Sequence, residues 1–155
     1  MRLRSATEAD LPVLRRLCVH TRPWGDYGPY MAEWLALPGA WVRVVELDGG
    51  DGVVALAVAV PVQVRERPWL EFRLLIVDPV DQRRGFGDAL VEDVQAQAWT
   101  SGADGVFASC ADDNEACLRM LCKRGFVPSR GPTGVTYPNG RPMVLLQWDT
   151  ARAVI

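Results

Sequence analysis

The sequence predicts an α/β fold: one domain over residues 1–155, with a mixed central sheet and helices on both of its faces. Three observations lead to this prediction. A chain of 155 residues and 17.1 kDa has the length of about one domain. Segments with a two-residue hydrophobic period and segments with a helical period follow one another in the order βααβββαβαββ. A helical segment also separates two apolar strands, 69–77 and 105–110, and such a crossover typically joins parallel strands.

The N-terminal part of the chain predicts one strand and two short helices. Residues 2–6 alternate weakly between polar and apolar side chains, which predicts a strand. Thr7 has the residue type of a helix N-cap, and Asp10 stands three positions later in place of the Glu of a capping box. Apolar residues at helical spacing follow it. A second short helix is predicted over 30–37, and the Pro-Gly pair that follows directly marks its end.

Three strands are predicted next, over 41–47, 53–64 and 69–77. The Gly- and Asp-rich turn at 48–52 favours an antiparallel hairpin between the first two. Pro61 in the second strand lacks an N–H donor, which predicts a kink or an edge position. Alternation in the third strand predicts one continuous apolar face, made of Leu70, Phe72, Leu74 and Ile76. The other face carries Glu71 and Arg73, and this pair of charges predicts a cleft or a solvent edge.

The second half of the chain predicts two further helices and three further strands. The helices are predicted over 85–100 and 114–124, and the strands over 105–110, 126–130 and 143–148. Gly125 follows the second of these helices and has the residue type of a left-handed C-cap. A turn-rich connection, 131–142, separates the last two strands. No internal repeat or linker divides the sequence.

Composition and charge exclude several classes of chemistry. The chain has 17 basic and 19 acidic side chains and a formal charge of −2, so we expect no binding to nucleic acid or to anionic membranes through net charge. Lys123 is the only lysine and His20 the only histidine, which argues against Schiff-base chemistry, His-based triads and His-rich metal sites. The four cysteines contain no CxxC pair, so we expect free thiols and no metal. With no secretory signal and no apolar run of the roughly 20 residues that span a bilayer, a cytoplasmic location is expected.

The segment QRRGFG at 82–87 is the most informative stretch, because it lies where a strand gives way to a helix. Glycines there let the backbone approach an anion, and the first N–H groups of the helix point toward it. The two arginines add positive charge for a phosphate. The alternative is a plain turn with solvated arginines. A Walker A loop requires a lysine after its second glycine, and a dinucleotide fingerprint requires a small residue at Leu90; both are absent.

Two separated motifs carry a resemblance to a known family. The first is Q-x-x-G-x-G over 82–87, preceded by a strand that ends at Val77. The second is N-x-x-C-x-x-M-L-x-x-x-G-F over 114–126, which is similar to a family pattern N-x-x-A-x-x-L-Y-x-x-x-G-F. Together they resemble the GNAT superfamily of N-acetyltransferases. The element order is also similar, so the resemblance covers nearly the full chain.

The resemblance implies that acetyl-CoA is the co-substrate and that its acetyl group passes to a primary amine by direct attack on the thioester. In that family the strand corresponding to 69–77 diverges from the one corresponding to 105–110, and the pantetheine arm binds in the opening like an added strand. The cofactor-binding residues that it implies are Leu75, Ile76, Val77, Gln82, Arg83, Arg84, Gly85, Phe86, Gly87, Asp88 and Asn114. The acceptor is expected to be a small molecule or a protein amine, and a homodimer is one assembly to test.

Glu71 is the candidate general base. It lies eleven residues before Gln82, where some GNAT enzymes carry a catalytic glutamate, and alternation places it on the same strand face as Val77. A base assists the reaction because an alkyl amine with a pKa near 10.4 is less than about 0.1% neutral at pH 7. Two alternatives are open: Glu71 pairs with Arg73 in an ion pair, or it binds the acceptor without taking a proton.

The sequence departs from the family pattern at Leu121, where many members have a tyrosine that protonates the leaving thiolate. The general acid is therefore unassigned; Cys122 and Tyr137 are the other residues considered, and Cys122 has the simpler interpretation of a structural cysteine. The same departure favours the alternative that the chain is a non-catalytic acyl-CoA-binding sensor or regulatory module, while Glu71 opposes it. A donor longer than acetyl is a further open alternative.

Residues 24–30, between the first two predicted helices, correspond to the acceptor side of GNAT folds. The segment holds three aromatic rings and Asp26, a combination suited to a cationic amine. The alternative is that these rings only anchor a loop rich in Gly and Pro.

Overall fold

The computed structural model describes residues 1–23, 25–48, 52–129 and 142–151. Its core is a seven-stranded sheet with the strand order β1-β2-β3-β4-β5-β7-β6. Only β4 and β5 pair in parallel; the other neighbours are antiparallel. The strands are β1 Arg2–Ser5, β2 Trp41–Leu47, β3 Gly52–Val64, β4 Arg67–Val77, β5 Gly105–Ala111, β6 Val127–Pro128 and β7 Met143–Asp149. The predicted α/β class and element order are confirmed.

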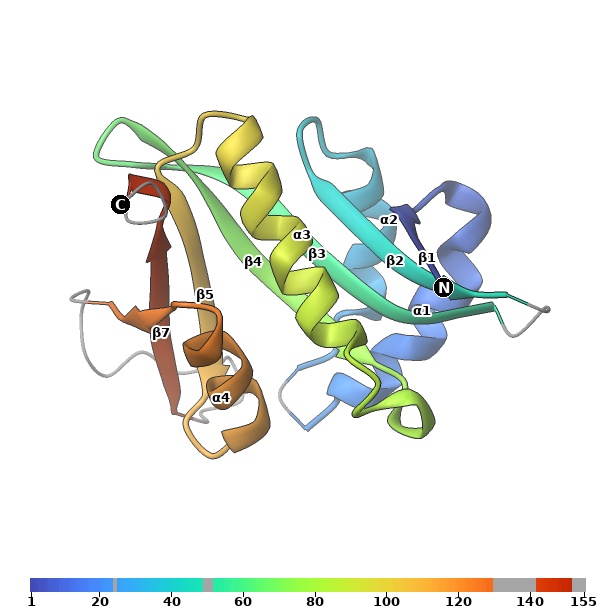
Figure 1. The fold of residues 1–155 in the computed structure, drawn as a ribbon. Coiled ribbons are helices and arrows are strands. Elements are labelled where there is room, and N and C mark those ends of the chain that lie inside the picture. The colour runs from blue at the N-terminus through green and yellow to red at the C-terminus, as the bar shows by residue number, and fades with distance from the viewer. Residues whose placement is uncertain (24, 49–51, 130–141, 152–155) are drawn as a thin grey trace.

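Two helices cover each face of the sheet (Figure 1). α1 (Leu11–Leu17) and α2 (Met31–Ala36) pack on one face, and α3 (Phe86–Thr100) and α4 (Glu115–Lys123) on the other. Short 3-10 turns stand at Glu8–Asp10, Cys18–Thr21, Gly28–Tyr30 and Pro79–Asp81. α3 is the crossover between β4 and β5, as its place in the sequence predicted. None of the helices in the described ranges is both long and apolar enough to cross a membrane.

A β-bulge in β4 overturns one sequence-based expectation. In the pairing with β3, Phe72 stands opposite Ala59 and Leu74 opposite Val58, so Arg73 has no partner residue. The extra residue shifts the alternation of side chains by one position. Phe72 therefore packs on the α3 side of the sheet, whereas Leu74 packs on the α1 side. The continuous apolar face predicted from Leu70, Phe72, Leu74 and Ile76 was wrong, because its first two members and its last two lie on opposite faces.

Other local predictions depended on single residues. β2 pairs with β3 only as far as Ala59, so Pro61 lies where β3 has a free edge, as its missing N–H predicted. Gly125 follows α4 with φ +90°, a left-handed conformation suited to a C-cap. The strand predicted over 126–130 is shorter than expected, because its pairing with β7 is confined to Val127 and Pro128. Most of the turn at 48–52 and of the connection at 131–142 lies outside the described residues.

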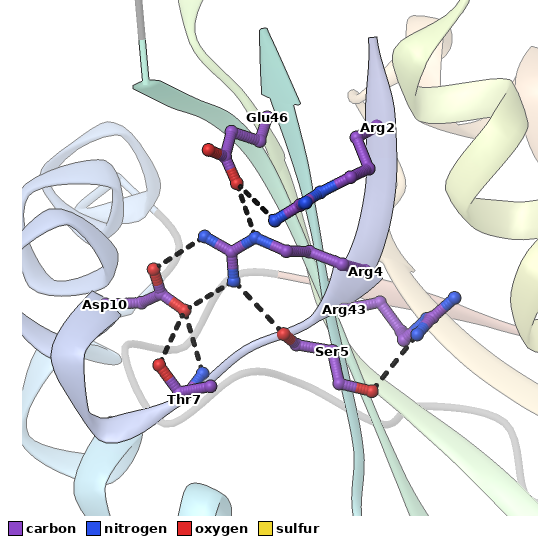
Figure 2. A network of polar contacts seen from close by, with 7 residues as sticks. All are labelled: Arg2, Arg4, Ser5, Thr7, Asp10, Arg43 and Glu46. Carbon is purple, nitrogen blue, oxygen red and sulfur yellow. Dashed lines mark hydrogen bonds and ion pairs between the residues drawn. The ribbon is translucent and has the colours of Figure 1, made fainter. Parts of the chain in front are cut away.

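An ion-pair network fastens β1 to β2 and to the start of α1 (Figure 2). Arg4 donates from Nη1 and Nη2 to both carboxylate oxygens of Asp10, at 2.8 and 2.9 Å, and from Nε to Glu46. Asp10 also accepts a hydrogen bond of 2.8 Å from the backbone N–H of Thr7, as the predicted N-cap pattern required. The Arg4 guanidinium holds the pKa of Asp10 below its ordinary value. We call Arg4, Asp10 and Glu46 the N-terminal network.

Candidate functional site

The sheet opens between its two parallel strands (Figure 1). β4 and β5 pair only where Leu70–Phe72 lies beside Val106–Ala108, although β4 continues to Val77 and β5 to Ala111. The pairing therefore ends next to the bulge at Arg73. Beyond that point the edge of β4 that would face β5 has no strand partner among the residues that the structure describes. This divergence is the feature that the family resemblance implied.

A cleft of about 310 Å³ occupies the opening. Five of the eleven predicted cofactor-binding residues line it: Leu75, Ile76, Val77, Gln82 and Asn114. Gln82 lies at the end of the cleft, where its side-chain amide donates a hydrogen bond of 3.4 Å to the backbone oxygen of Val77. Asn114 caps α4 by accepting from the backbone N–H of Cys117 at 3.3 Å. Strand end and helix start thus meet around one cavity.

The other six predicted residues form the turn into α3. Gly85 is the N-cap and has φ +82°, which favours glycine there. Gly87 packs closely against α4 and the end of β4: a Cβ at this position would stand 3.0 Å from Met120 Sδ and 3.5 Å from Val77 Cγ2. Because Phe86 is buried in the core, only its backbone is available to a ligand in this turn. No side chain caps the start of this 15-residue helix, so its first backbone N–H groups are suited to bind an anion.

Two charged side chains of this turn, Arg84 and Asp88, already have partners. Arg84 forms an ion pair of 2.9 Å with Asp81, and its guanidinium lies 4.9 Å from the centre of the Phe86 ring. Asp88 lies 3.6 Å from Arg124. Arg83 has φ +65°, an uncommon conformation for a residue with a side chain. Of the two arginines expected near a phosphate, Arg84 would have to exchange its carboxylate partner for the ligand.

Glu71 and Arg73 lie at the border between two hollows. Their side chains form an ion pair of 3.1 Å, with 42% and 40% of their surfaces exposed. Arg73 lines the cleft, while Glu71 lines a second hollow of about 320 Å³, and Ala108 and Ser109 line both. The ion pair that the sequence left open as an alternative is therefore present.

The bulge also corrects the expected face of Glu71. Because alternation is interrupted at Arg73, Val77 packs against the α3 cluster, on the same side as Phe72, and Glu71 points to the opposite side of the sheet from both. The expectation that Glu71 and Val77 share a face was wrong. The second hollow that Glu71 lines is bounded mainly by apolar side chains of β3, β5 and β7.

Two tyrosines of the aromatic segment pack against Trp34 of α2. The ring centroids of Tyr27 and Tyr30 lie 6.1 and 5.7 Å from that of Trp34. Tyr27 also lines the cleft, together with His20 and Thr21, and burial raises the pKa of its hydroxyl. The anchoring interpretation therefore holds for these two tyrosines, while Trp24 lies outside the described residues.

Sequence reasoning gave no role to several residues that line the cleft, among them His20, Thr21 and Cys117. No periodic signal marks the first two, because they belong to a short 3-10 turn after α1. Leu121 also lines the cleft and is buried in the α3 cluster, so no hydroxyl stands at the position of the family tyrosine. Cys122 is exposed, and Tyr137 lies outside the described residues.

Fold and site together define a class of protein: an α/β fold whose sheet opens between two parallel strands, with a glycine turn and a helix start at the end of the opening. The family described as the acetyltransferase (GNAT) family matches residues 10–126, so the chain belongs to this family. Among curated proteins, none matches the sequence significantly.

Solved structures show the same fold across nearly the whole chain. NAA60 from Arabidopsis thaliana, in complex with acetyl-CoA, aligns with a TM-score of 0.84 at 16% identity, over 97% of this chain and 98% of the other. A ribosomal-protein-alanine N-acetyltransferase from Brucella melitensis gives 0.80 at 22% identity, over 96% and 99%. The putative acetyltransferase yncA from Salmonella typhimurium, with its cofactor acetyl-CoA, gives 0.75 at 22% identity, over 96% and 92%. At these identities the likeness establishes the fold.

Proposed function

We propose that this protein is a cytoplasmic N-acetyltransferase that moves the acetyl group of acetyl-CoA to a primary amine. The observation that carries the proposal is the divergence of β4 from β5 beyond Phe72 and Ala108. Within the described part of the chain, it leaves the backbone of 73–77 without a strand partner on the cleft side. Those peptide groups can pair with the two amides of a pantetheine arm, in the way that an added strand pairs with a sheet edge. Relatives of the same fold that hold acetyl-CoA support this choice of ligand.

In this proposal the pyrophosphate lies over the backbone N–H groups of 83–88. The helix start supplies partial positive charge, and the open space beside Gly85 leaves room for the phosphate oxygens. The net charge of −2 does not oppose binding, because the site is local. Leu75, Ile76, Val77 and Gln82 from one side and Asn114 from the other would flank the arm.

Glu71 is the proposed general base. Its ion pair with Arg73 is a single contact between two side chains that are each about two-fifths exposed, and such pairs contribute little in water. An incoming ammonium can therefore compete with Arg73 for the carboxylate. Once Glu71 has taken a proton, the neutral amine attacks the thioester carbon, the C–S bond breaks, and CoA leaves as a thiolate. The new amide nitrogen sheds its extra proton to solvent, from which the thiolate can be protonated. A thiol with a pKa near 8.5 leaves tolerably without a positioned acid, which is consistent with Leu121 in place of tyrosine.

The buried, apolar Leu121 is also the observation that favours the second candidate function, a non-catalytic acyl-CoA-binding sensor. Both candidates require acetyl-CoA in the cleft, and they differ in whether an amine is consumed. A panel of primary amines, small molecules and peptides alike, assayed for release of CoA from acetyl-CoA, separates them. Release with none of these amines, in a protein that binds acetyl-CoA, would favour the sensor.

Cofactor binding is tested by titration calorimetry with acetyl-CoA. In the variant Gly87→Glu a carboxylate at the start of α3 opposes the positive potential offered to phosphate, so we expect no measurable binding. Ala96→Glu, which adds the same charge to an exposed position of α3, is the matched control and should bind like the wild type. The double variant R83A/R84A should weaken binding less, because these side chains are not the only source of positive potential. Wild-type affinity in Gly87→Glu, with an unchanged circular dichroism spectrum, would remove the assignment.

A further inference from the structure

Two cysteine thiols meet in the wall of the cleft. Cys110 lies near the end of β5, and Cys117 lies in the first turn of α4; both line the cleft. The two thiols share a side-chain hydrogen bond. The other two cysteines differ: Cys18 is buried in the cluster around α1, and Cys122 is exposed on α4. The proposed reaction uses neither member of the contacting pair.

The two thiols are unequal in accessibility and in acidity. Cys117 is partly exposed, whereas Cys110 is 2% exposed. The hydrogen bond with Cys110 lowers the pKa of the Cys117 thiol, and the place of Cys117 in the first turn of a helix acts in the same direction. The same hydrogen bond, together with burial and the charge of Asp113, raises the pKa of the Cys110 thiol. Cys117 therefore has the properties of an attacking thiol, and Cys110 those of a resolving thiol.

We propose that Cys117 and Cys110 form a thiol–disulfide exchange site for a disulfide that carries a pantetheine arm, such as oxidised CoA. The preference for this class of disulfide rests on the proposed function, because the cleft that binds the pantetheine arm is the cavity that both thiols line. Cys117 contacts that cavity from α4 while Cys110 stands behind it in β5. A small disulfide docked there reaches Cys117 first.

The exchange balances in two steps. The thiolate of Cys117 attacks one sulfur of the CoA disulfide, its S–S bond breaks, and one CoA leaves as a thiolate. The thiol of Cys110 then loses its proton and attacks Cys117, so that the second CoA leaves and takes up that proton. Two cysteine thiols are oxidised to one disulfide, and one CoA disulfide is reduced to two CoA thiols. The mixed disulfide of the first step fills the cleft and so excludes acetyl-CoA.

The test treats the reduced full-length protein with oxidised CoA, quenches with acid and maps the peptides by mass spectrometry. We expect a disulfide between Cys110 and Cys117. Cys110→Ser should stop at the mixed disulfide with CoA on Cys117, and Cys117→Ser should give neither product. Cys122→Ser is the matched control and should still form the disulfide. Modification of wild-type protein only at Cys122, or a Cys117→Ser protein that reacts like wild type at Cys110, would overturn the proposal.

Two measurements on the wild-type protein need no variant. Oxidised CoA should react with Cys117 at least about tenfold faster than oxidised glutathione at equal concentration, because docking raises the local concentration of the disulfide. Saturating acetyl-CoA should slow the reaction at Cys117 and leave Cys122 unaffected. If acetyl-CoA binds in calorimetry but gives no protection, this inference fails and the proposed function stands. If acetyl-CoA does not bind, the proposed function fails. If Cys117 then also reacts equally fast with oxidised CoA and oxidised glutathione, the preference for a pantetheine disulfide is overturned as well.

Discussion

Two groups of charged side chains on the same sheet differ in how completely they are engaged. In the N-terminal network, Arg4 makes two hydrogen bonds to Asp10 and one to Glu46, and the side chains of Arg4 and Asp10 are 23% and 11% exposed. At the cleft border, Glu71 and Arg73 share one contact and are about two-fifths exposed. The first group joins three elements, β1, β2 and the start of α1, whereas the second joins two residues of one strand.

This difference separates a structural role from a chemical one. Asp10 accepts from Arg4 and from the backbone of Thr7, so its lone pairs are committed and the pKa of its carboxyl is held low. A carboxylate of that kind is a poor proton acceptor. Glu71 makes a single ion-pair contact and lines an accessible hollow, so it keeps the capacity to meet a ligand. The predictions below test this contrast.

The largest effect is expected from Glu71→Gln. The amide keeps the shape of the side chain but cannot accept a proton, so turnover should fall by about 10²–10⁴-fold, the usual contribution of a positioned base. Acetyl-CoA affinity should hardly change. The defect should shrink as the pH rises toward the pKa of the acceptor amine, where neutral amine becomes plentiful. Steady-state rates across pH, with an amine from the panel, measure the size of the defect. A near wild-type rate at neutral pH would contradict the assignment of Glu71 as the base.

Asp10→Asn should show the opposite profile. The substitution removes the charged partner of a partly buried arginine, and we expect the free energy of unfolding to fall by about 1–3 kcal/mol. For a domain of this size that corresponds to about 2–4 °C in Tm per kcal/mol. Turnover by the folded protein should be unchanged, since Asp10 lies outside the cleft and the second hollow. Loss of turnover with full stability would contradict the division of roles.

The pH dependence of stability provides a smaller, signed test. The folded-state pKa of Asp10 is lowered, mainly by its hydrogen bonds from Arg4. Its contribution is therefore fully present above the unfolded value of about 3.9 and is lost as the pH falls from there through the lower folded-state value. Urea unfolding from about pH 7 to about pH 3 should show the gap between wild type and Asp10→Asn shrinking only at the acid end. A gap independent of pH would mean that the charge of Asp10 does not stabilise the fold.

The smallest effect is expected from Arg73→Gln. An ion pair between two such exposed side chains contributes less than about 1 kcal/mol, so Tm should hardly move. Turnover should fall far less than with Glu71→Gln, because the carboxylate remains. Differential scanning fluorimetry and the amine assay measure both quantities. A loss of stability as large as that of Asp10→Asn would mean that the pair at the cleft border is structural after all.

The sequence by itself determined the element order, the element boundaries to within a few residues, and the family. These depend on local rules: a hydrophobic period of two or 3.6 residues, turn residues between segments, and caps such as Thr7 and Gly125. The glycine turn at 82–87 and the helix start at Asn114 could also be predicted, because each is a short motif at an element boundary. Roles of single residues in that site stay predictions.

Only the tertiary structure decided which residues meet. The bulge at Arg73 arises from the register of β4 against β3, so alternation along β4 alone gave the wrong faces for Leu74, Ile76 and Glu71. The N-terminal network and the contact between Cys110 and Cys117 join segments whose approach depends on sheet pairing and helix packing. Periodicity reports which side of its own element a residue occupies. It carries no information on which other element faces that side, and that decided both which carboxylate is committed to the fold and which thiols border the cleft.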